Sequence, residues 1–175
     1  MDKQALVTYA TKYGATAEIA EKIGEVLRQA GLRTVVQPVE RVGDVSHYDA
    51  VVLGSAVYIG RWRKEAAKYL KVHEKTLAQR PVWIFNSGPL GEGNAAEQAG
   101  DLGFPKGLRP IAERIKVRDV AIFFGAVDLE KLNPLERWMF KNVESPIGDF
   151  RDWEAISAWA LSIAAELKEG QPDRW

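Results

Sequence analysis

Residues 11–16 combine residue types and spacing that suit the binding of a phosphate group. Thr11 and Thr16 supply hydroxyls, and Gly14 lies between them, directly before a stretch with helical periodicity. A helix that begins here presents unpaired backbone N–H groups and the positive end of its dipole, and both attract a phosphate. The alternative is that a threonine only caps the helix and that Gly14 only forms a turn.

Composition excludes several other kinds of chemistry. The chain has 175 residues and no cysteine, which excludes thiolate catalysis, iron–sulfur clusters and a disulfide scaffold. It has only two histidines, His47 and His73, too few for a multi-histidine metal site. Neither histidine falls in a candidate ligand-binding loop, so we predict no acid–base catalytic residue and no metal site.

Charge and hydropathy narrow the set of partners and compartments. The 24 basic and 24 acidic side chains balance, which gives no electrostatic case for nucleic acid or for an anionic membrane as partner. The chain contains no run of 18 apolar residues and no signal-peptide pattern at its start. We therefore expect a cytoplasmic protein with no membrane association, or a peripheral one at most.

Five short runs rich in apolar and β-branched residues are predicted to be strands, and helical segments lie between them. The strands are expected at residues 5–9, 34–39, 50–54, 81–85 and 120–125. Helical periodicity covers residues 17–27, with Gly31 as the stop, and predicts further helices over 63–77 and 153–167. Asp152 is the expected cap of the last helix.

This alternation predicts right-handed βαβ units, in which helices cover both faces of a parallel sheet. We expect one three-layer α/β domain over residues 1–175, with five parallel strands. An insertion at about 126–151 separates the fifth strand from the last helix and contains a short apolar helix. Ligands of such sheets bind beyond the carboxyl ends of the strands, where the strand order reverses. The loops after the first, third and fourth strands are therefore predicted to converge on a ligand crevice.

The first of these loops is similar to the FMN phosphate loop of flavodoxins, because Thr11, Gly14 and Thr16 match its pattern. The segments 54–60 and 86–91 fall where flavodoxin-like proteins line the two sides of the isoalloxazine ring. The resemblance covers the whole chain and implies a flavodoxin-like fold with strand order 2-1-3-4-5 and FMN at the switch point. Neither the Walker pattern nor Gly-x-Gly-x-x-Gly occurs, which disfavours a nucleoside triphosphate or dinucleotide site.

Within these proteins, the chain resembles the menaquinone-dependent protoporphyrinogen oxidase branch. The phosphate loop, the place of the insertion and the opening of the last helix with Asp152, Trp153 and Glu154 are similar. The resemblance implies an FMN-dependent oxidoreductase that passes electrons from a reduced substrate to a quinone-like acceptor. Its candidate partners are a redox protein or a small molecule such as a quinone or a porphyrinogen.

The resemblance assigns the cofactor site to residues of all three loops. Tyr58 and Trp62 are candidates for stacking on the ring, with packing in the protein interior as the alternative for both. Leu90 is the candidate for the opposite side, and Arg61 and Arg63 are candidates for steering an anionic substrate. The predicted FMN contacts are Thr11, Lys12, Tyr13, Gly14, Ala15, Thr16, Ser55, Ala56, Val57, Tyr58, Gly60, Ser87, Gly88, Leu90 and Gly91.

Two features depart from the family pattern. Tyr13 and Ala15 stand where polar residues are common, so we expect weakened or rearranged phosphate binding rather than none. The insertion of the porphyrinogen oxidases is basic, which is not so in this chain. Here the basic residues are offset by acidic ones, and this argues against a porphyrinogen substrate and against membrane docking. The residues concerned are Lys131, Arg137 and Lys141 on one side and Asp128, Glu130, Glu136 and Glu144 on the other.

The short helix in the insertion has an apolar face. With Pro134 in its first turn, the residues Leu135, Trp138, Met139 and Val143 fall on one side. This face either forms a wall for a planar apolar partner such as a quinone, or packs on the domain or at a homodimer contact.

Two other functions compete with the oxidoreductase hypothesis. One is a pure electron carrier that has no substrate of its own and shuttles between redox proteins. The other is a flavin-free module used for binding or regulation, an alternative raised by Tyr13 and Ala15.

Overall fold

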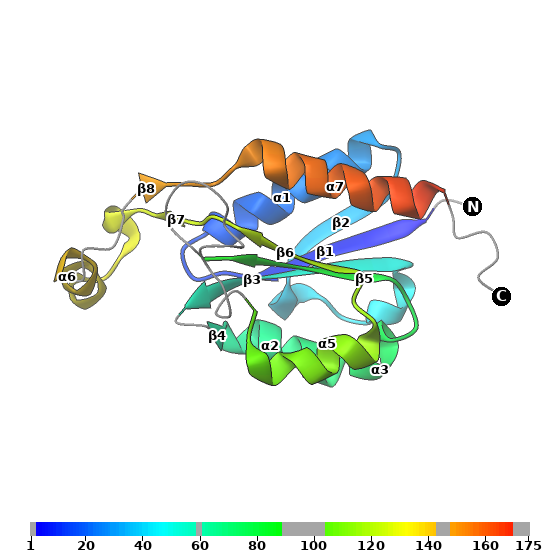
Figure 1. The fold of residues 1–175 in the computed structure, drawn as a ribbon, viewed down its shortest axis with the longest axis horizontal. Helices are drawn as coiled ribbons and strands as arrows, with labels where there is room; N and C mark the ends of the chain where they lie inside the picture. Colours follow the sequence, from blue (N-terminus) through cyan, green and yellow to red (C-terminus); the bar gives the residue numbers. More distant parts are fainter. Residues whose placement is uncertain (1–2, 59–60, 89–103, 143–147, 170–175) are drawn as a thin grey trace.

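The computed structural model describes residues 3–58, 61–88, 104–142 and 148–169, and the statements below concern these residues. A central sheet lies between two layers of helices (Figure 1). Its main strands are β1 (Gln4–Ala10), β2 (Arg33–Pro38), β3 (Ala50–Tyr58), β5 (Val82–Ser87) and β6 (Asp119–Phe123). All neighbouring pairs are parallel, in the order β2-β1-β3-β5-β6. For these five strands this is the predicted order 2-1-3-4-5.

Two short antiparallel additions were not predicted. Strand β4 (Arg61–Trp62) pairs with the end of β3, and β7 (Ala126–Val127) pairs with β8 (Gly148–Asp149) in a separate ribbon. Each strand has only two residues, too few to show the alternating pattern by which a strand is recognised in a sequence.

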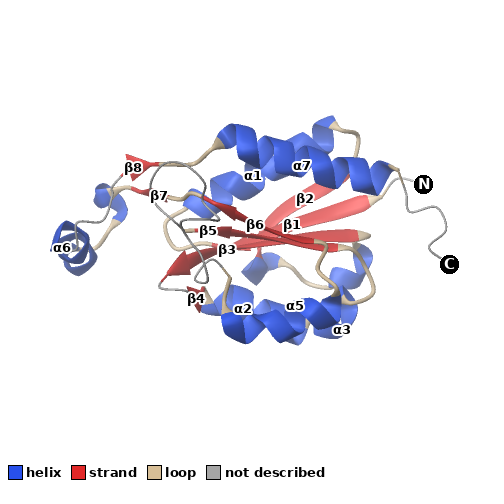
Figure 2. Ribbon diagram, viewed as in Figure 1, coloured by secondary structure: helices blue, strands red, loops and turns tan. Residues whose placement is uncertain are grey.

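The helices divide between the two faces of the sheet (Figure 2). Helices α1 (Ala15–Gln29) and α7 (Trp153–Lys168) cover one face, and α2 (Lys64–Val72), α3 (Glu74–Leu77) and α5 (Arg109–Ile115) cover the other. Side chains alternate between two apolar cores along each strand, because successive residues point to opposite faces. The core under α1 and α7 contains Val7, Phe85 and Ile163, and the core over α2 and α5 contains Leu6, Ile84 and Leu70.

Two helical expectations need correction. The predicted helix over residues 63–77 is divided into α2 and α3 at His73, whose φ of −98° and ψ of 13° leave the helical range. Helix α5 was missed because it has seven residues and buries only Ile111 and Ile115, too few to establish a period. It ends at Ile115, and the next residue, Lys116, has a positive φ of 61°.

The predicted helix in the insertion is α6 (Pro134–Asn142). Asn133 precedes it, and the Asn133 Oδ1 accepts a hydrogen bond of 2.8 Å from the backbone N–H of Glu136. Figure 1 shows α6 beyond the end of the sheet to which the carboxyl ends of the strands point. Across the described ranges, no helix has the length and apolar character needed to span a bilayer.

Candidate functional site

The strand register brings the three predicted loops together at one edge of the sheet. Ala10 at the end of β1 is paired with Ser55 of β3, and Ala56 is paired with Ser87 of β5. The segments that follow these strands therefore start side by side. This is the place where doubly wound sheets bind ligands.

The loop after β1 leads into a helix whose first turn has no side-chain cap. Gly14 has a φ of +95°, a conformation that glycine adopts without strain, and α1 begins at the next residue. The Thr11 hydroxyl accepts a hydrogen bond of 3.0 Å from the Gly14 N–H, so it stabilises the turn before the helix. Thr16 lies in the first turn and is 1 % exposed. The backbone N–H groups of this turn are left to bind an anion.

Lys12 and Tyr13 lie side by side in this loop. The Lys12 ammonium is 5.1 Å from the centre of the Tyr13 ring and 3.1 Å from the Glu136 Oε2 of α6. The Tyr13 hydroxyl is buried and has no hydrogen-bond partner among the described residues. Tyr13 and Ala15 also line a pocket of about 510 Å³, whose other walls come from Glu18, residues 126–129, Lys131, residues 148–149 and Arg151.

The segment after β3 is held in place by the side chain of Ser55. The buried Ser55 hydroxyl accepts a hydrogen bond from the Arg63 N–H at 3.1 Å and donates one to the Ala56 carbonyl at 2.9 Å. Ser55 thus holds the turn that leads into α2, and its hydroxyl is already engaged. Tyr58 pairs with Arg61 in the β3–β4 hairpin; its side chain and Gly60 lie outside the described residues.

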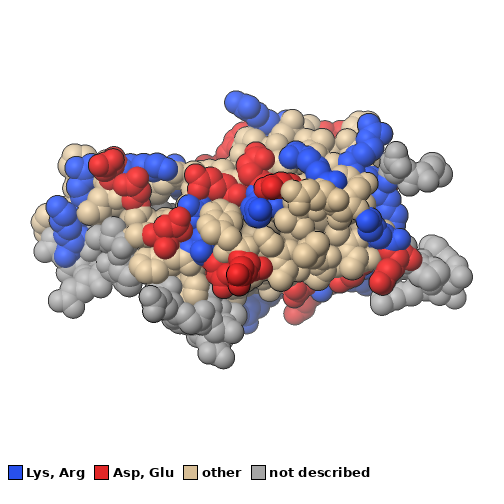
Figure 3. Space-filling view, turned by 90° about the horizontal axis from the view of Figure 1, so that it is seen from above, with Lys and Arg blue, Asp and Glu red and all other residues tan. Residues whose placement is uncertain are grey.

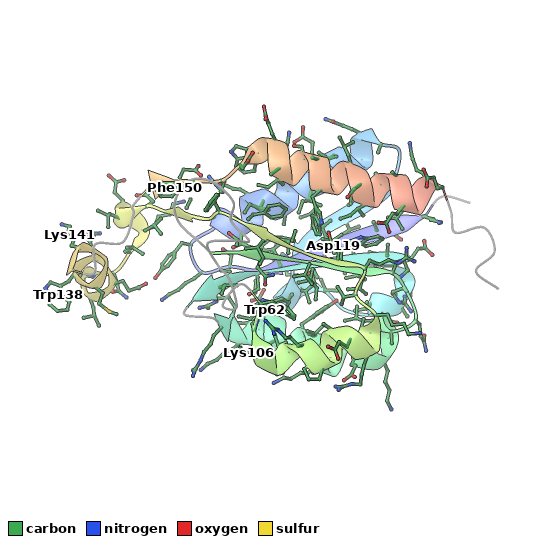
Figure 4. The ribbon with its side chains drawn as sticks, in the orientation of Figure 1. Trp62, Lys106, Asp119, Trp138, Lys141 and Phe150 are labelled. Carbon is green, nitrogen blue, oxygen red and sulfur yellow. The ribbon has the colours of Figure 1, made fainter. Side chains whose placement is uncertain are left out.

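Trp62 is a core residue in this structure. It is 7 % exposed, lies on the α2 side of the sheet (Figure 4), and contacts the edge of Phe104 at 5.6 Å between ring centres. Its Nε1–H donates a hydrogen bond of 2.6 Å to the Asn86 Oδ1. Asn86 in turn donates from its Nδ2 to the Ala121 carbonyl at 3.3 Å. The sequence left two interpretations of Trp62, stacking on the flavin ring and packing in the protein interior. The structure supports packing.

Directly after β5, Gly88 lies against Val57 near the end of β3. A Cβ atom at this position would lie 2.9 Å from the Val57 carbonyl oxygen, so only glycine fits without a shift. The Gly88 N–H also donates to the Phe123 carbonyl of β6 at 3.3 Å. Ser87 is buried beside it. Leu90 and Gly91 lie outside the described residues.

Arg151 connects the end of the insertion to the start of α1. It donates a hydrogen bond of 3.3 Å to the Ala15 carbonyl, forms an ion pair with Glu18, and binds both carboxylate oxygens of Asp149 at 2.6 and 2.9 Å. These hydrogen bonds lower the pKa of Asp149 and raise that of Arg151. The guanidinium also lies over the Trp153 ring, 4.8 Å from its centre.

Comparison with known proteins assigns this arrangement to a family. The model of the flavodoxin domain matches residues 6–153. The chain belongs to the flavodoxin domain family. It is similar to flavodoxin 2 from Bacillus cereus, with a TM-score of 0.60 and 21 % identity, over 93 % of this chain and 99 % of that one. It is also similar to a flavodoxin from the domain Archaea, with a TM-score of 0.60 and 14 % identity, over 94 % and 99 % of the two chains.

One similar protein is named as an enzyme. Protoporphyrinogen IX dehydrogenase (quinone) from Escherichia coli is 21 % identical to this flavodoxin-domain chain over 172 residues. The match covers 92 % of this chain and 94 % of that protein. The family and this likeness support a redox role for the chain.

Two residues with hydrogen bonds at this edge of the sheet, Asn86 and Arg151, are not among the predicted FMN contacts, although Asn86 opens the predicted segment 86–91. Asn86 and Arg151 bind partners that are 24 and 136 residues away along the chain. The position of Asn86 at the end of a buried strand was the one available signal for it. For Arg151 we find no local signal.

Both histidines lie away from the three loops. His47 belongs to a short 3-10 helix (Val45–His47) before β3, and His73 separates α2 from α3. The His73 ring packs on Tyr69, with 4.4 Å between ring centres, and burial raises the pKa of the Tyr69 hydroxyl. Among the residues that the structure describes, no group of His, Asp and Glu side chains is arranged to hold a metal ion.

Proposed function

We propose that the protein binds FMN at the carboxyl ends of β1, β3 and β5 and acts as an FMN-dependent oxidoreductase. In this role it passes electrons from a reduced substrate to a quinone-like acceptor. The observation that carries the proposal is the uncapped first turn of α1 behind Gly14, next to two further loops in register with it. A phosphate group suits this turn because it accepts hydrogen bonds from several backbone N–H groups at once.

The residues present fit the phosphate end of FMN. The N–H groups of the first turn of α1, the Thr16 hydroxyl and the Lys12 ammonium would bind the phosphate. Gly14 allows a close approach, and a Cβ atom there would meet nothing within 4 Å. Tyr13 brings a hydroxyl that has no partner in the described part of the chain. It is a further candidate donor for this end of the cofactor.

The ring end is proposed to lie between the loops after β3 and β5. The first side would be formed by Ala56, Val57, Tyr58 and Gly60, and the second by Ser87, Gly88, Leu90 and Gly91. Ser55 and Asn86 act as positioning residues, because their side chains hold these loops by hydrogen bonds. FMN, when bound, supplies the redox chemistry, and the protein supplies binding and orientation.

The proposed acceptor rests on the likeness to the Escherichia coli protein, whose name includes a quinone. Protoporphyrinogen is the substrate that the same name suggests. The mixed charge of the insertion argues against it, because acidic and basic side chains both lie at the end of the molecule that carries α6 (Figure 3).

The test of FMN binding is the absorbance spectrum of the purified protein. We expect a yellow protein that releases one FMN per chain, or a colourless one that regains this spectrum when FMN is added. A colourless protein that cannot be reconstituted with FMN would contradict the proposal and favour a flavin-free binding module.

A pure electron carrier is the second candidate, and the likeness of the fold to flavodoxins favours it. The two functions differ in turnover. A reduced oxidoreductase gives up two electrons to a soluble quinone analogue, and it does so repeatedly when its reduced substrate is supplied to reduce it again. A carrier shows no such turnover and exchanges single electrons with a redox protein.

A further inference from the structure

The Lys12 side chain of the phosphate loop is bound to a carboxylate from the insertion. Its Nζ lies 3.1 Å from the Glu136 Oε2, and the two side chains are 41 % and 20 % exposed. Lys12 follows Thr11 directly, so its ammonium belongs to the same short loop that leads into the first turn of α1. The Lys12 ammonium therefore already has an ion-pair partner in this structure.

Glu136 belongs to a helix that has much of its surface outside the protein interior. Leu135 is 66 % exposed and Met139 is 51 % exposed. Figure 4 places Trp138 and Lys141 on this helix at the end of the molecule, far from Trp62. The start of α6 is tied to the preceding turn, since Arg137 donates to the Leu129 and Leu132 carbonyls at 3.0 and 3.1 Å. The ion pair with Lys12 adds a link from α6 to the loop after β1.

A phosphate monoester and the Glu136 carboxylate compete for the same cation. The phosphate carries about 1.5 to 2 negative charges at pH 7, more than the single charge of a carboxylate. If Lys12 turns toward the phosphate, Glu136 loses its partner. If Lys12 stays, the phosphate binds near an additional negative charge. In both cases the carboxylate disfavours phosphate binding.

We propose that Glu136 is a positioning residue that acts through Lys12 to weaken the binding of the FMN phosphate, and that phosphate binding in turn releases α6 from the loop. This inference rests on the proposed FMN site. The Lys12–Glu136 ion pair weakens phosphate binding by the same free energy by which phosphate binding weakens the ion pair, because coupling between two equilibria is reciprocal. Phosphate binding at the loop after β1 and the attachment of α6 to that loop are then energetically coupled.

The substitution Glu136→Gln tests the first half of this inference. Glutamine keeps the size and the amide oxygen but removes the charge. We expect it to bind FMN about fivefold more tightly, the ratio that corresponds to an ion-pair effect at the upper end for partly exposed pairs. Riboflavin, which lacks the phosphate, should bind with unchanged affinity. The matched control is Glu130→Gln, which removes an exposed carboxylate with no ion pair among the described residues and should leave both affinities unchanged.

Backbone hydrogen exchange of residues 134–142 tests the second half. In the wild-type protein, FMN should increase exchange in α6 and riboflavin should not. In Glu136→Gln, exchange should be raised before any flavin is added, and FMN should add little.

The outcomes separate the inference from the proposed function. Wild-type protein that binds neither flavin would overturn the FMN site, and the inference with it. Wild-type protein that binds FMN, together with a Glu136→Gln variant of equal FMN affinity or with equally tightened riboflavin binding, would overturn the inference alone. Exchange in α6 that does not respond to FMN would also overturn it.

Discussion

Thr16 is the residue at which the proposed phosphate contact is most directly testable. Thr16→Val keeps the branched shape and removes the hydroxyl, and we expect it to weaken FMN binding by about 1 kcal/mol or more. The affinity for riboflavin should not change, because riboflavin brings no phosphate to this hydroxyl. Isothermal titration with both flavins measures the difference.

Thr16→Ser is the control for this change, since it keeps the hydroxyl and should retain most of the FMN affinity. Because Thr16 is 1 % exposed, unfolding of each variant should be followed in parallel. Equal FMN affinity for the valine and wild-type proteins would exclude a hydrogen bond from Thr16 to the phosphate.

Gly88 lies directly after β5 and close to Val57 near the end of β3. Gly88→Ala would place a Cβ atom 2.9 Å from the Val57 carbonyl oxygen. We expect a loss of about 1–3 kcal/mol in the free energy of unfolding, the usual cost of overpacking, measured by urea denaturation. FMN binding should weaken as well, because the two backbone segments must separate.

Gly43→Ala is the matched control, because a Cβ atom there would meet nothing within 4 Å and no positive φ is required. Its effect should stay within about 0.5 kcal/mol. If Gly88→Ala is as stable as this control, the backbone around Gly88 and Val57 accommodates a Cβ atom with no loss of unfolding free energy.

Single residues differ in how far their contacts could be predicted from the sequence. Thr11, Gly14 and the start of α1 are neighbours along the chain, so their arrangement was predictable from spacing alone. Asn86 and Arg151 act on distant partners, and only the folded chain brings them together. The side chain of Trp62 was ambiguous in the sequence because aromatic residues serve both stacking and packing.

Among the elements, the β7–β8 ribbon is attached to α1 through Arg151, and a pH titration can report on this attachment. Hydrogen bonds from Arg151 hold the pKa of Asp149 below its ordinary value. We expect Arg151→Met to raise the pKa of Asp149 toward that value, as followed by NMR of the carboxyl carbon. A group with a lowered folded-state pKa adds stability above its unfolded-state pKa and loses it as the pH falls through the folded-state pKa. The acid-induced loss of stability should therefore be shallower in the variant.

Asp44 serves as the internal reference in the same titration. Its pKa is also lowered, but by hydrogen bonds from Ser46, which Arg151→Met does not touch. A shift of Asp44 together with Asp149 would point to a general change in the protein rather than to loss of the Arg151 contact.

Elements with a clear period were predicted and short ones were not. Helices α1 and α7 have 15 and 16 residues, and their buried positions recur at helical spacing. The break at His73 depends on backbone angles that the apolar pattern of residues 63–77 does not encode. The two-residue strands β4, β7 and β8 arise from pairing with partners, so they have no signature of their own.

On the scale of the whole molecule, the two cores share one sheet. A destabilising substitution in either core should therefore lower the stability of both. Ile163→Ala removes a fully buried side chain from the core under α1 and α7. We expect a loss of about 2–5 kcal/mol in the free energy of unfolding. Circular dichroism and tryptophan fluorescence should give coincident transitions, as in two-state unfolding.

Leu161→Ala on the same helix is the control, because Leu161 is 56 % exposed. Leu161→Ala should lower the free energy of unfolding by much less than Ile163→Ala does. Transitions that separate between the two probes in Ile163→Ala would show that unfolding is not two-state.

The alternation of strands and helices predicted the parallel sheet, and the resemblance to flavodoxins predicted its strand order. The place of the described part of the insertion was not predictable, since it depends on the ion pairs of Glu136 with Lys12 and of Arg151 with Glu18. We propose that residues 1–175 form one domain, with residues 126–151 as an insertion that contacts the phosphate loop.

Because Gly88 has no side chain, the backbone after β5 lies close to Val57 near the end of β3. A side chain at position 88 would push these two segments apart. In the proposed FMN site, substitutions at Ala56 or Ser87 would then change side-chain chemistry while the distance between the two backbone segments stays the same. The fit of a planar ligand and the choice of its reaction partner could then evolve separately.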